Sequence, residues 1–300
     1  MRVTPSLRQL RFLVALSEHL HFGRAAEACF VTQSTLSSAL KDMEDIMGVA
    51  LVERTRRSVM MTPIGEEIAA RGRLVLRDVE DMMDLAESSA KPLTGRLRLG
   101  VIPTIGPFVL PGITRITREA FPDLKLYLRE EQTVPLLEHL REGTVDLALI
   151  ALPWELDQSM DSMVLGHDAF SLVCPSAHDL AGPGEVSGAQ LMRDDLLLLE
   201  EGHCLRDHAL GVCGADRRRS ESFQATSLTT LTQMVESGLG ITLLPDMAVK
   251  AGLAKDLCVR PVKGDAMGRD IALVWRKASH RAEDYPKLGE VMKAVLNPQS

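Results

Sequence analysis

The apolar positions of the first 50 residues recur at helical spacing. Between Leu10 and Ala50 they repeat every three or four positions, which predicts short amphipathic helices. Thr32 offers a hydroxyl N-cap for a helix over residues 33–47, and Gly48 is placed to end it. We therefore expect three short helices, the last of which follows a tight turn.

Two short strand-like segments, residues 51–54 and 58–62, surround a basic group that contains Arg54, Arg56 and Arg57. Such a pair of segments is typical of a two-stranded wing. Helices followed by a basic wing are the arrangement that lays one helix across DNA and inserts the next into the major groove.

A single long helix is expected next, from Pro63 to residue 90, since proline suits the first turn of a helix. Alternating spacings of 4 and 3 form a heptad seam along it, made of Ile68, Gly72, Val75, Val79, Met82 and Ala86. The seam indicates a dimerising coiled coil, and the alternative is a solvated helix that lies on its own domain.

Beyond the hinge-like residues 91–95, strand patterns alternate with helical ones. Strands are expected at 97–102, 124–128, 145–151, 170–174, 196–199, 222–225, 241–244 and 271–275. This alternation predicts a mostly parallel sheet with helices on both faces and two lobes around a cleft. We expect lobe I at about 91–166 and 270–300 and lobe II at about 167–269.

Composition narrows the class of protein. The chain has 300 residues, 45% of them hydrophobic and 25% charged, so it can bury a full core. No apolar run approaches the roughly 18 residues of a membrane span, and the charged N-terminus does not resemble a signal peptide. Five cysteines are too few for the disulfide framework of a secreted module. We expect a cytoplasmic protein without contact to the membrane.

The net charge of −7 conceals a local difference. Residues 1–65 hold eight Lys and Arg against six Asp and Glu, so any nucleic-acid surface is expected near the N-terminus. Glutamine can pair with adenine, and Lys or Arg can neutralise phosphate. The candidate DNA-binding residues are Arg8, Thr32, Gln33, Ser34, Thr35, Ser37, Ser38, Lys41 and Arg54. Taken singly, their hydroxyls are as well explained as solvated helix residues.

Sequence motifs of common enzymes are absent. The chain has no phosphate-binding glycine loop, no dinucleotide fingerprint, no nucleophile elbow and no H-E-x-x-H pair. We therefore expect a protein that is not an enzyme and that uses no cofactor.

Four segments of the N-terminal part, residues 12–16, 21–26, 31–37 and 51–55, resemble the winged helix-turn-helix of LysR-type transcriptional regulators. Residues 238–245 resemble the effector domain of the same family. The resemblance implies an α+β protein with a winged helix-turn-helix at 1–62, a linker helix at 63–90 and a two-lobed α/β domain at 91–300, similar to periplasmic binding proteins. It also implies a dimer of dimers that binds an inverted-repeat operator in double-stranded DNA and contacts RNA polymerase. Ser34 stands where the family usually has proline, and Asp42 stands where a basic residue is common.

The segment 202–213 contains a candidate redox centre. Cys204 follows an apolar strand and opens a helical segment, where backbone N–H groups, His203 and Arg206 could stabilise a thiolate. Cys213 is the candidate partner. Nine residues of helix rise roughly 13 Å, whereas a disulfide needs a Cα separation of roughly 4.4–6.8 Å, so bond formation would unwind the helix.

Two other interpretations of this segment are open. Both cysteines could be small buried core residues. A metal site could instead use His203, Cys204, His208 and Cys213, although we expect none. Cys29, Cys174 and Cys258 lie in strongly apolar patterns and are expected to be packing residues.

Together with residues 102–107 and 130–133, this segment resembles the OxyR group of hydrogen-peroxide sensors within the LysR-type family. By that resemblance Cys204 is the peroxidatic cysteine and Cys213 its resolving partner, reset by a thiol-disulfide reductant. The same resemblance makes Thr104, Thr133 and His203 the groups that hold peroxide, and Arg206, Asp207 and Arg269 the groups that tune the thiolate. Capping of the helices that follow is an alternative role for both threonines.

A peroxide-sensing transcriptional regulator is thus the leading hypothesis. One alternative keeps the fold but places a small organic effector in the cleft between the lobes. Another is a thiol peroxidase, for which the typical T-x-x-C motif is lacking.

Overall fold

The computed structural model describes residues 3–54, 59–88, 92–191, 196–213, 224–264 and 267–296. The chain divides into two compact units, one containing residues 1–89 and 142–144 and the other containing residues 90–141 and 145–300. None of the helices in these described stretches is long and apolar enough to cross a membrane.

The first unit is built as the sequence predicts. Its elements are α1 (Leu7–His19), α2 (Phe22–Ala28), α3 (Gln33–Met47), β1 (Val52–Arg54), β2 (Val59–Met61) and α4 (Pro63–Ser88). The hydroxyl of Thr32 accepts a hydrogen bond from the Thr35 N–H at 3.2 Å, and Gly48 ends α3 in the left-handed conformation. β1 and β2 form the expected antiparallel wing, whose tip, residues 55–58, lies outside the described residues.

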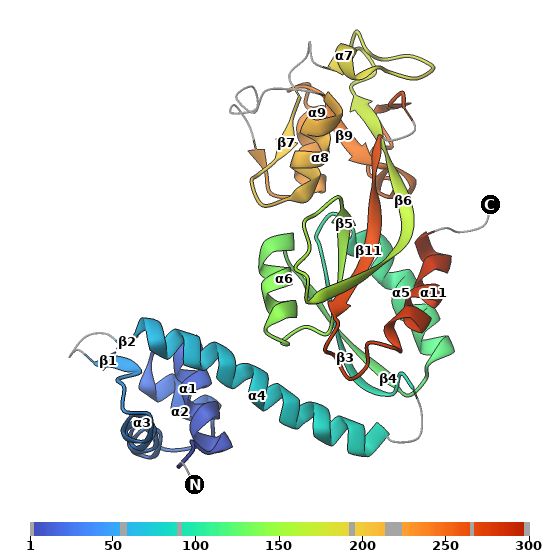
Figure 1. The fold of residues 1–300 in the computed structure, drawn as a ribbon. Coiled ribbons are helices and arrows are strands. Elements are labelled where there is room, and N and C mark those ends of the chain that lie inside the picture. Colours follow the sequence, from blue (N-terminus) through green and yellow to red (C-terminus); the bar gives the residue numbers. More distant parts are fainter. Residues whose placement is uncertain are drawn as a thin grey trace. The chain divides into compact units, whose positions relative to one another are not determined.

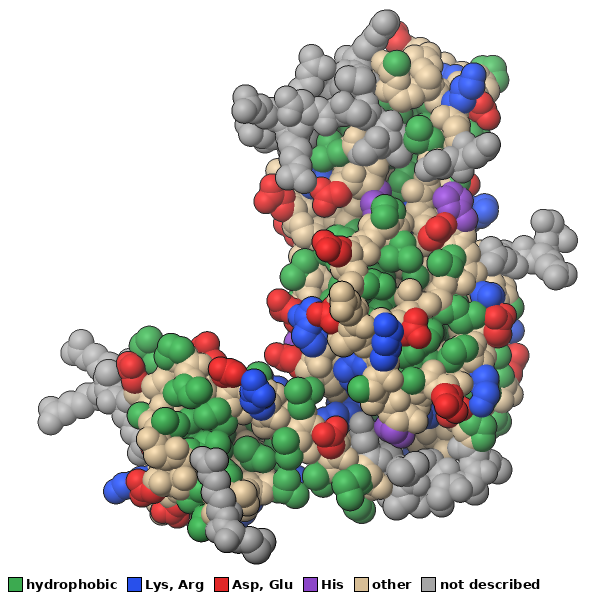
Figure 2. Space-filling view, viewed as in Figure 1, with side chains coloured by type: hydrophobic (Ala, Val, Ile, Leu, Met, Phe, Trp, Pro, Cys, Tyr) green, Lys and Arg blue, Asp and Glu red, His purple; other side chains and the backbone are tan. Residues whose placement is uncertain are grey.

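Helix α4 begins at Pro63 as expected, and its first half packs within its own unit. A Cβ at Gly72 would meet the side chains of Leu10 and Val14 of α1 at 3.5–3.6 Å, an ordinary van der Waals distance, so this seam position faces α1. Apolar side chains reach the surface of this unit on the face shown in Figure 2. Farther along α4, Val75 is 43% exposed and Met82 is 68% exposed. The seam therefore differs along its length: its start belongs to the core of the unit, whereas Val75 and Met82 expose much of their apolar surface.

The second unit contains a seven-stranded sheet in the order β10-β6-β11-β5-β3-β4, with β9 also paired to β6 (Figure 1). Its strands are β3 (Gly95–Val101), β4 (Leu124–Glu130), β5 (Leu147–Leu152), β6 (Met160–Cys174), β9 (Thr242–Pro245), β10 (Cys258–Pro261) and β11 (Gly268–Arg276). β7 (Leu198–Leu199) and β8 (Gln224–Ala225) form a separate parallel pair. The helices are α5 (Gly106–Ala120), α6 (Thr133–Arg141), α7 (Gly188–Leu191), α8 (Cys204–Cys213), α9 (Leu228–Glu236), α10 (Asp246–Lys250) and α11 (Tyr285–Leu296).

The prediction of a mostly parallel large sheet is wrong. Only β3 pairs in parallel there, with β4 and β5, whereas β6 pairs antiparallel with β9, β10 and β11, and β11 pairs antiparallel with β5. The reason is that β6 carries the chain from one lobe to the other and β11 carries it back, so the two run side by side in opposite directions (Figure 1). The first half of β6 and all of β10 were not predicted as strands.

Two lobes with separate cores result. One apolar cluster combines β3, β5 and α6 with the later part of β11 and α11. Two further clusters lie in the other lobe, around Phe170 and Leu172 of β6. Cys204 is an exception: it belongs to α8 of the second lobe, but its side chain packs into the cluster of the first. This places its sulfur where the lobes meet.

Candidate functional site: a buried thiol between two lobes

Cys204 is the first residue of α8, and a sharp turn after β7 brings it there. Gly202 in this turn has a φ of +97°, and a Cβ at this position would lie 2.3 Å from the side chain of Gln132. Only glycine combines that conformation with that approach. The turn leaves Cys204 only 3% exposed, in contact with the core of the first lobe, while Leu205 packs into the second.

Opposing effects act on the thiol. Burial raises the pKa of Cys204, because a thiolate loses hydration there. The positive charge of Arg269, the hydroxyl of Thr133 and the backbone N–H of Leu205 each lower this pKa, and the Asp207 carboxylate raises it slightly. Burial dominates, so the resting thiol is protonated and its ionisation depends on these few groups.

Arg269 is the main charge near the sulfur, and it is held rigidly. It lies on β11, only 1% exposed, and its Nε donates to the Asp168 carboxylate at 3.1 Å. One Nη donates to the hydroxyl of Thr104 at 2.7 Å and the other to the carbonyl of Thr104 at 2.8 Å. A guanidinium fixed by three acceptors is positioned before any oxidant arrives.

Asp168 balances this buried cation. It stands directly opposite Arg269 in the antiparallel register of β6 and β11, and it also accepts from the backbone N–H of Met247. Burial raises the pKa of Asp168, whereas Arg269 and that N–H lower it. Sequence analysis did not identify Asp168. To find Asp168, the register of β6 with β11 would have been needed, and this part of β6 was not predicted as a strand.

Thr104 and Thr133 are buried on different elements, and the capping alternative is wrong for both. The N-cap of α5 is Ile105, without a side-chain hydrogen bond, and the Thr104 hydroxyl instead accepts from Arg269. The Thr104 hydroxyl therefore keeps its own proton available to donate. Thr133 begins α6, and its buried hydroxyl has no hydrogen-bond partner of ordinary geometry among the described residues. This hydroxyl acts on the Cys204 thiol and makes no other hydrogen bond among the described residues, so it has capacity left to bind a small polar molecule.

The other predicted site residues lie around this centre. His203 is buried with its Nε2 3.8 Å from the Glu200 carboxylate, and burial lowers its pKa. The guanidinium of Arg206 donates to the carbonyl of Leu199, which ties α8 to β7. Asp207 is exposed. Arg269, on a distant strand, is the cation that acts on the sulfur.

Cys213 is the last residue of α8, and its side chain lies outside the described part of the chain. The helix is continuous from Cys204, so the two backbones are roughly 13 Å apart by helical rise. Among the described side chains, no group of three or more His, Cys, Asp or Glu could hold a metal ion.

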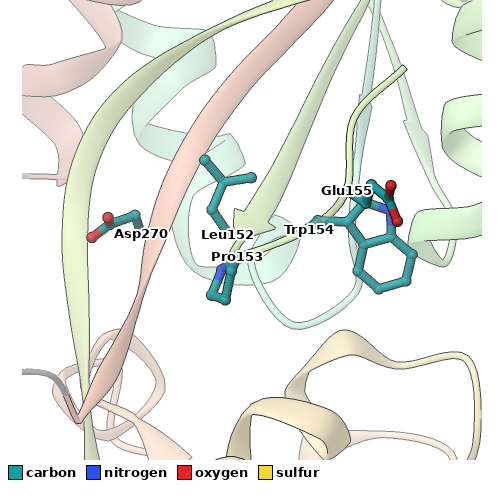
Figure 3. Close-up of a pocket in the computed structure, with 5 residues that line it drawn as sticks. All are labelled: Leu152, Pro153, Trp154, Glu155 and Asp270. Atoms are coloured by element: carbon teal, nitrogen blue, oxygen red, sulfur yellow. The ribbon is translucent and has the colours of Figure 1, made fainter. Parts of the chain in front are cut away.

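A pocket of about 630 Å³ lies next to α8 at the end of β5 (Figure 3). It is lined by Leu152, Pro153, Trp154, Glu155 and Asp270. The Nε2 of His208 lies 3.2 Å from the carbonyl oxygen of Pro153, and burial lowers the pKa of His208. This contact between lobes is a second feature that sequence analysis missed.

The candidate DNA surface is on the first unit. At the start of α3, Gln33, Ser34 and Thr35 are exposed, and so are Ser38 and Lys41 farther along; Ser37 is half-buried. The Thr32 hydroxyl lies 3.0 Å from that of Ser34 and 2.8 Å from that of Thr35, so part of this polar group is ordered by the cap. Arg8 is exposed on α1, and the side chain of Arg54 lies outside the described residues.

Two known protein families together match nearly the whole chain. Residues 7–66 match the bacterial regulatory helix-turn-helix protein family, lysR type, and residues 90–296 match the LysR substrate binding domain. The chain is 40% identical to the transcriptional dual regulator OxyR of Escherichia coli, over 97% of this chain and 96% of that one. It is also 40% identical to EstR, a helix-turn-helix transcriptional regulator of Acinetobacter baylyi, over 98% of both chains.

Solved structures agree with these relatives. A full-length OxyR variant from Pseudomonas aeruginosa has a TM-score of 0.79 at 34% identity and covers 98% of this chain and 97% of its own. A hydrogen-peroxide-bound OxyR variant from Corynebacterium glutamicum has a TM-score of 0.68 at 35% identity, with 99% and 94% coverage. The similarity therefore extends over both units.

Proposed function

Since the chain belongs to the LysR family of bacterial transcriptional regulators, we propose that it senses hydrogen peroxide through Cys204 and transmits the signal to bound DNA. The observation that carries this proposal is the setting of the sulfur. A protonated, buried thiol lies near the charge of a fixed Arg269 and the unpartnered hydroxyl of Thr133. Arg269 also binds the hydroxyl of Thr104.

The first step is attack of the Cys204 thiolate on one peroxide oxygen. A sulfur–oxygen bond forms, the oxygen–oxygen bond breaks, and the second oxygen leaves as hydroxide, which takes up a proton to become water. The charge that develops on the leaving oxygen is stabilised by a positioned donor, and Thr104 has a free proton because it accepts from Arg269. Thr133 and His203 complete the set of polar groups that hold peroxide beside the sulfur.

The second step joins Cys204 to Cys213. The Cys213 thiol attacks the sulfenic sulfur, a disulfide forms and water leaves. Because a continuous α8 keeps these residues roughly 13 Å apart, the helix has to unwind first. Loss of the helix removes the packing of Cys204 and His208 against the first lobe. A local oxidation therefore changes the surfaces with which the lobes contact neighbouring subunits.

DNA binding follows from the first unit. A dimer, and by resemblance a dimer of dimers, would bind an inverted-repeat operator with one α3 in each major groove. The change in the regulatory domains would alter the spacing of the DNA-binding units. The contacts with operator DNA and with RNA polymerase would then change as well. The protein would work in the cytoplasm, where a thiol-disulfide reductant resets it.

Mass spectrometry after one equivalent of hydrogen peroxide tests the sensing step. We expect an intramolecular Cys204–Cys213 bond in the wild type, a stable sulfenic acid of Cys204 or its alkylated adduct in Cys213→Ser, and no oxidation of Cys213 in Cys204→Ser. Unchanged thiols in the wild type would overturn the proposal. A sensor also consumes about one peroxide per reduction cycle, so sustained peroxide removal with a thiol reductant would make the protein a peroxidase instead.

A small organic effector is the second candidate, favoured by the pocket at Pro153, Trp154 and Asp270. In that case operator binding by the Cys204→Ser variant would still respond fully to the inducing condition. Under the leading proposal the same variant loses the response.

A further inference from the structure

Two cysteines outside the proposed sensor lie face to face in the sheet. Cys174 ends β6 and Cys258 begins β10, and the register of this antiparallel pair places them directly opposite each other. Both are reduced in the structure. Directly opposite residues of antiparallel strands have Cα atoms about 4.5–5.5 Å apart, and a disulfide accepts roughly 4.4–6.8 Å. Their side chains also leave the sheet on the same face.

The surroundings hold this pair in place. Cys174 is fully buried in an apolar cluster of the second lobe, and Cys258 packs against the same cluster while keeping part of its surface exposed. The backbone N–H of Gly182 donates to the sulfur of Cys258 at 3.5 Å. Arg260 lies two residues after Cys258 on the same face of the sheet. Its guanidinium donates to the carbonyls of Leu180, Gly184 and Glu185, which holds the segment that contains Gly182 in place.

We propose that Cys174 and Cys258 form a second disulfide site, which closes without any change of secondary structure. This distinguishes it from Cys204 and Cys213, whose helix must unwind. The oxidant is hydrogen peroxide, and Cys258 reacts first because it is the more exposed residue of the pair. The product ties the edge strand β10 covalently to β6.

The chemistry balances. The sulfur of Cys258 attacks a peroxide oxygen, a sulfur–oxygen bond forms, the oxygen–oxygen bond breaks, and water leaves. The thiol of Cys174 then attacks the sulfenic sulfur of Cys258, a sulfur–sulfur bond forms, the sulfur–oxygen bond breaks, and a second water leaves. Two thiols lose two electrons and two protons, and one peroxide becomes two waters.

The test uses the full chain with Cys204→Ser, so that the proposed sensor cannot react and the two proposals fail independently. The variant is treated with excess hydrogen peroxide, quenched with an alkylating reagent in denaturant, and mapped as non-reduced peptides. We expect a peptide that contains Cys174 linked to one that contains Cys258, with Cys29 still alkylated. The link should be absent from Cys204→Ser/Cys174→Ser and from Cys204→Ser/Cys258→Ser.

Three outcomes would overturn the proposal: alkylation of both Cys174 and Cys258 after oxidation, over-oxidation of Cys258 beside an alkylated Cys174, or linkage of Cys258 to any other cysteine, including one of a second chain. A second measurement guards against loss of structure in the variants. The oxidised Cys204→Ser protein should unfold at a higher urea concentration than the reduced one, because a crosslink restrains the unfolded chain. This difference should vanish in the Cys258→Ser double variant.

Discussion

The Nε2 atom of His208 lies 3.2 Å from the carbonyl oxygen of Pro153, so the helix that begins with Cys204 is attached to the end of β5 in the other lobe. A carbonyl oxygen only accepts hydrogen bonds, so Nε2 carries the proton. Oxidation that unwinds α8 has to break this bond. The bond therefore favours the reduced state and sets part of the threshold at which the proposed switch operates.

Replacing His208 by alanine should make the Cys204–Cys213 disulfide easier to form and harder to reduce. One neutral hydrogen bond contributes about 0.5–1.5 kcal/mol, which corresponds to roughly a 2- to 12-fold higher ratio of disulfide to dithiol in a fixed thiol buffer. The ratio is measured by alkylation and mass spectrometry over a series of buffer potentials.

The amide of His208→Gln can also donate to the carbonyl of Pro153, so this variant should restore much of the wild-type ratio. His178→Ala is a matched control in the same lobe, since the Nδ1 of His178 accepts a hydrogen bond from the backbone N–H of Leu180, two residues along the chain. Equal ratios in the alanine and glutamine variants of His208 would contradict a role for this hydrogen bond.

Arg269 should control how fast Cys204 reacts. Burial raises the pKa of this thiol and Arg269 is the largest effect that lowers it, so Arg269→Met should raise the pKa further and slow the reaction with peroxide by tenfold or more. The rate of thiol loss measured against pH checks this, because the rising limb should move to higher pH.

Arg269→Met also leaves Asp168 as a buried, unpaired carboxylate, which costs about 3–5 kcal/mol of stability. The double variant Arg269→Met/Asp168→Asn removes both charges and separates the two effects. It should recover stability in urea denaturation while its reaction stays slow. A double variant that reacts as fast as the wild type would show that Arg269 acts only on folding.

The sequence predicted most elements but not their pairing. α3 and its caps depend on neighbouring residues, so Thr32 and Gly48 were sufficient to place its ends. The partnership of Arg269 with Asp168 depends on the register of two strands more than 90 residues apart, which no local pattern encodes. The same holds for Cys174 and Cys258, which local sequence identified only as packing residues.

The site was predictable only in part, for a similar physical reason. Cys204 was recognisable because a strand, a glycine turn and a helix start lie together in the sequence. Arg206 lies two residues after Cys204 but donates to the carbonyl of Leu199, whereas the charge of Arg269, on a distant strand, lowers the pKa of the Cys204 thiol. Local sequence therefore pointed to Arg206, and resemblance to a family was needed to find Arg269.

Stability should decline on mild acidification because of the imidazoles of His203, which is buried, and His208, which is half-buried. Burial lowers the pKa of both His203 and His208 below 6.5, so the unfolded chain binds more protons than the folded one as the pH falls below that value. Their contribution is complete above pH 6.5 and is lost as the pH falls towards the folded-state pKa values. Urea denaturation between about pH 7.5 and 5 measures this. His208→Gln should show a shallower decline, and an unchanged slope would exclude His208 as one of the groups.

The exposed part of the α4 seam should mediate dimer formation. Met82 belongs to the heptad series and is 68% exposed, whereas Met83 is 61% exposed but lies outside that series. Met82→Lys should weaken the dimer strongly because a charge would be buried at the seam. Met83→Lys, with the same charge and similar exposure, is the control. Sedimentation at a series of concentrations distinguishes them, and equal dissociation constants would place the dimer contact elsewhere.

Two exposed residues of α3 should affect DNA binding differently. Lys41 would neutralise a phosphate, so Lys41→Ala should weaken binding to every DNA sequence. The slope of log affinity against log salt should become shallower by about 1 for each DNA-bound unit. Gln33 lies at the start of the helix, where it can reach a base edge, so Gln33→Ala should cost about 1–3 kcal/mol for the operator only. Titrations with operator and unrelated DNA at several salt concentrations separate the two effects. If Gln33→Ala weakened both DNAs equally, the glutamine would be a backbone contact, and sequence recognition would have to come from other residues of α3 or from the shape of the DNA.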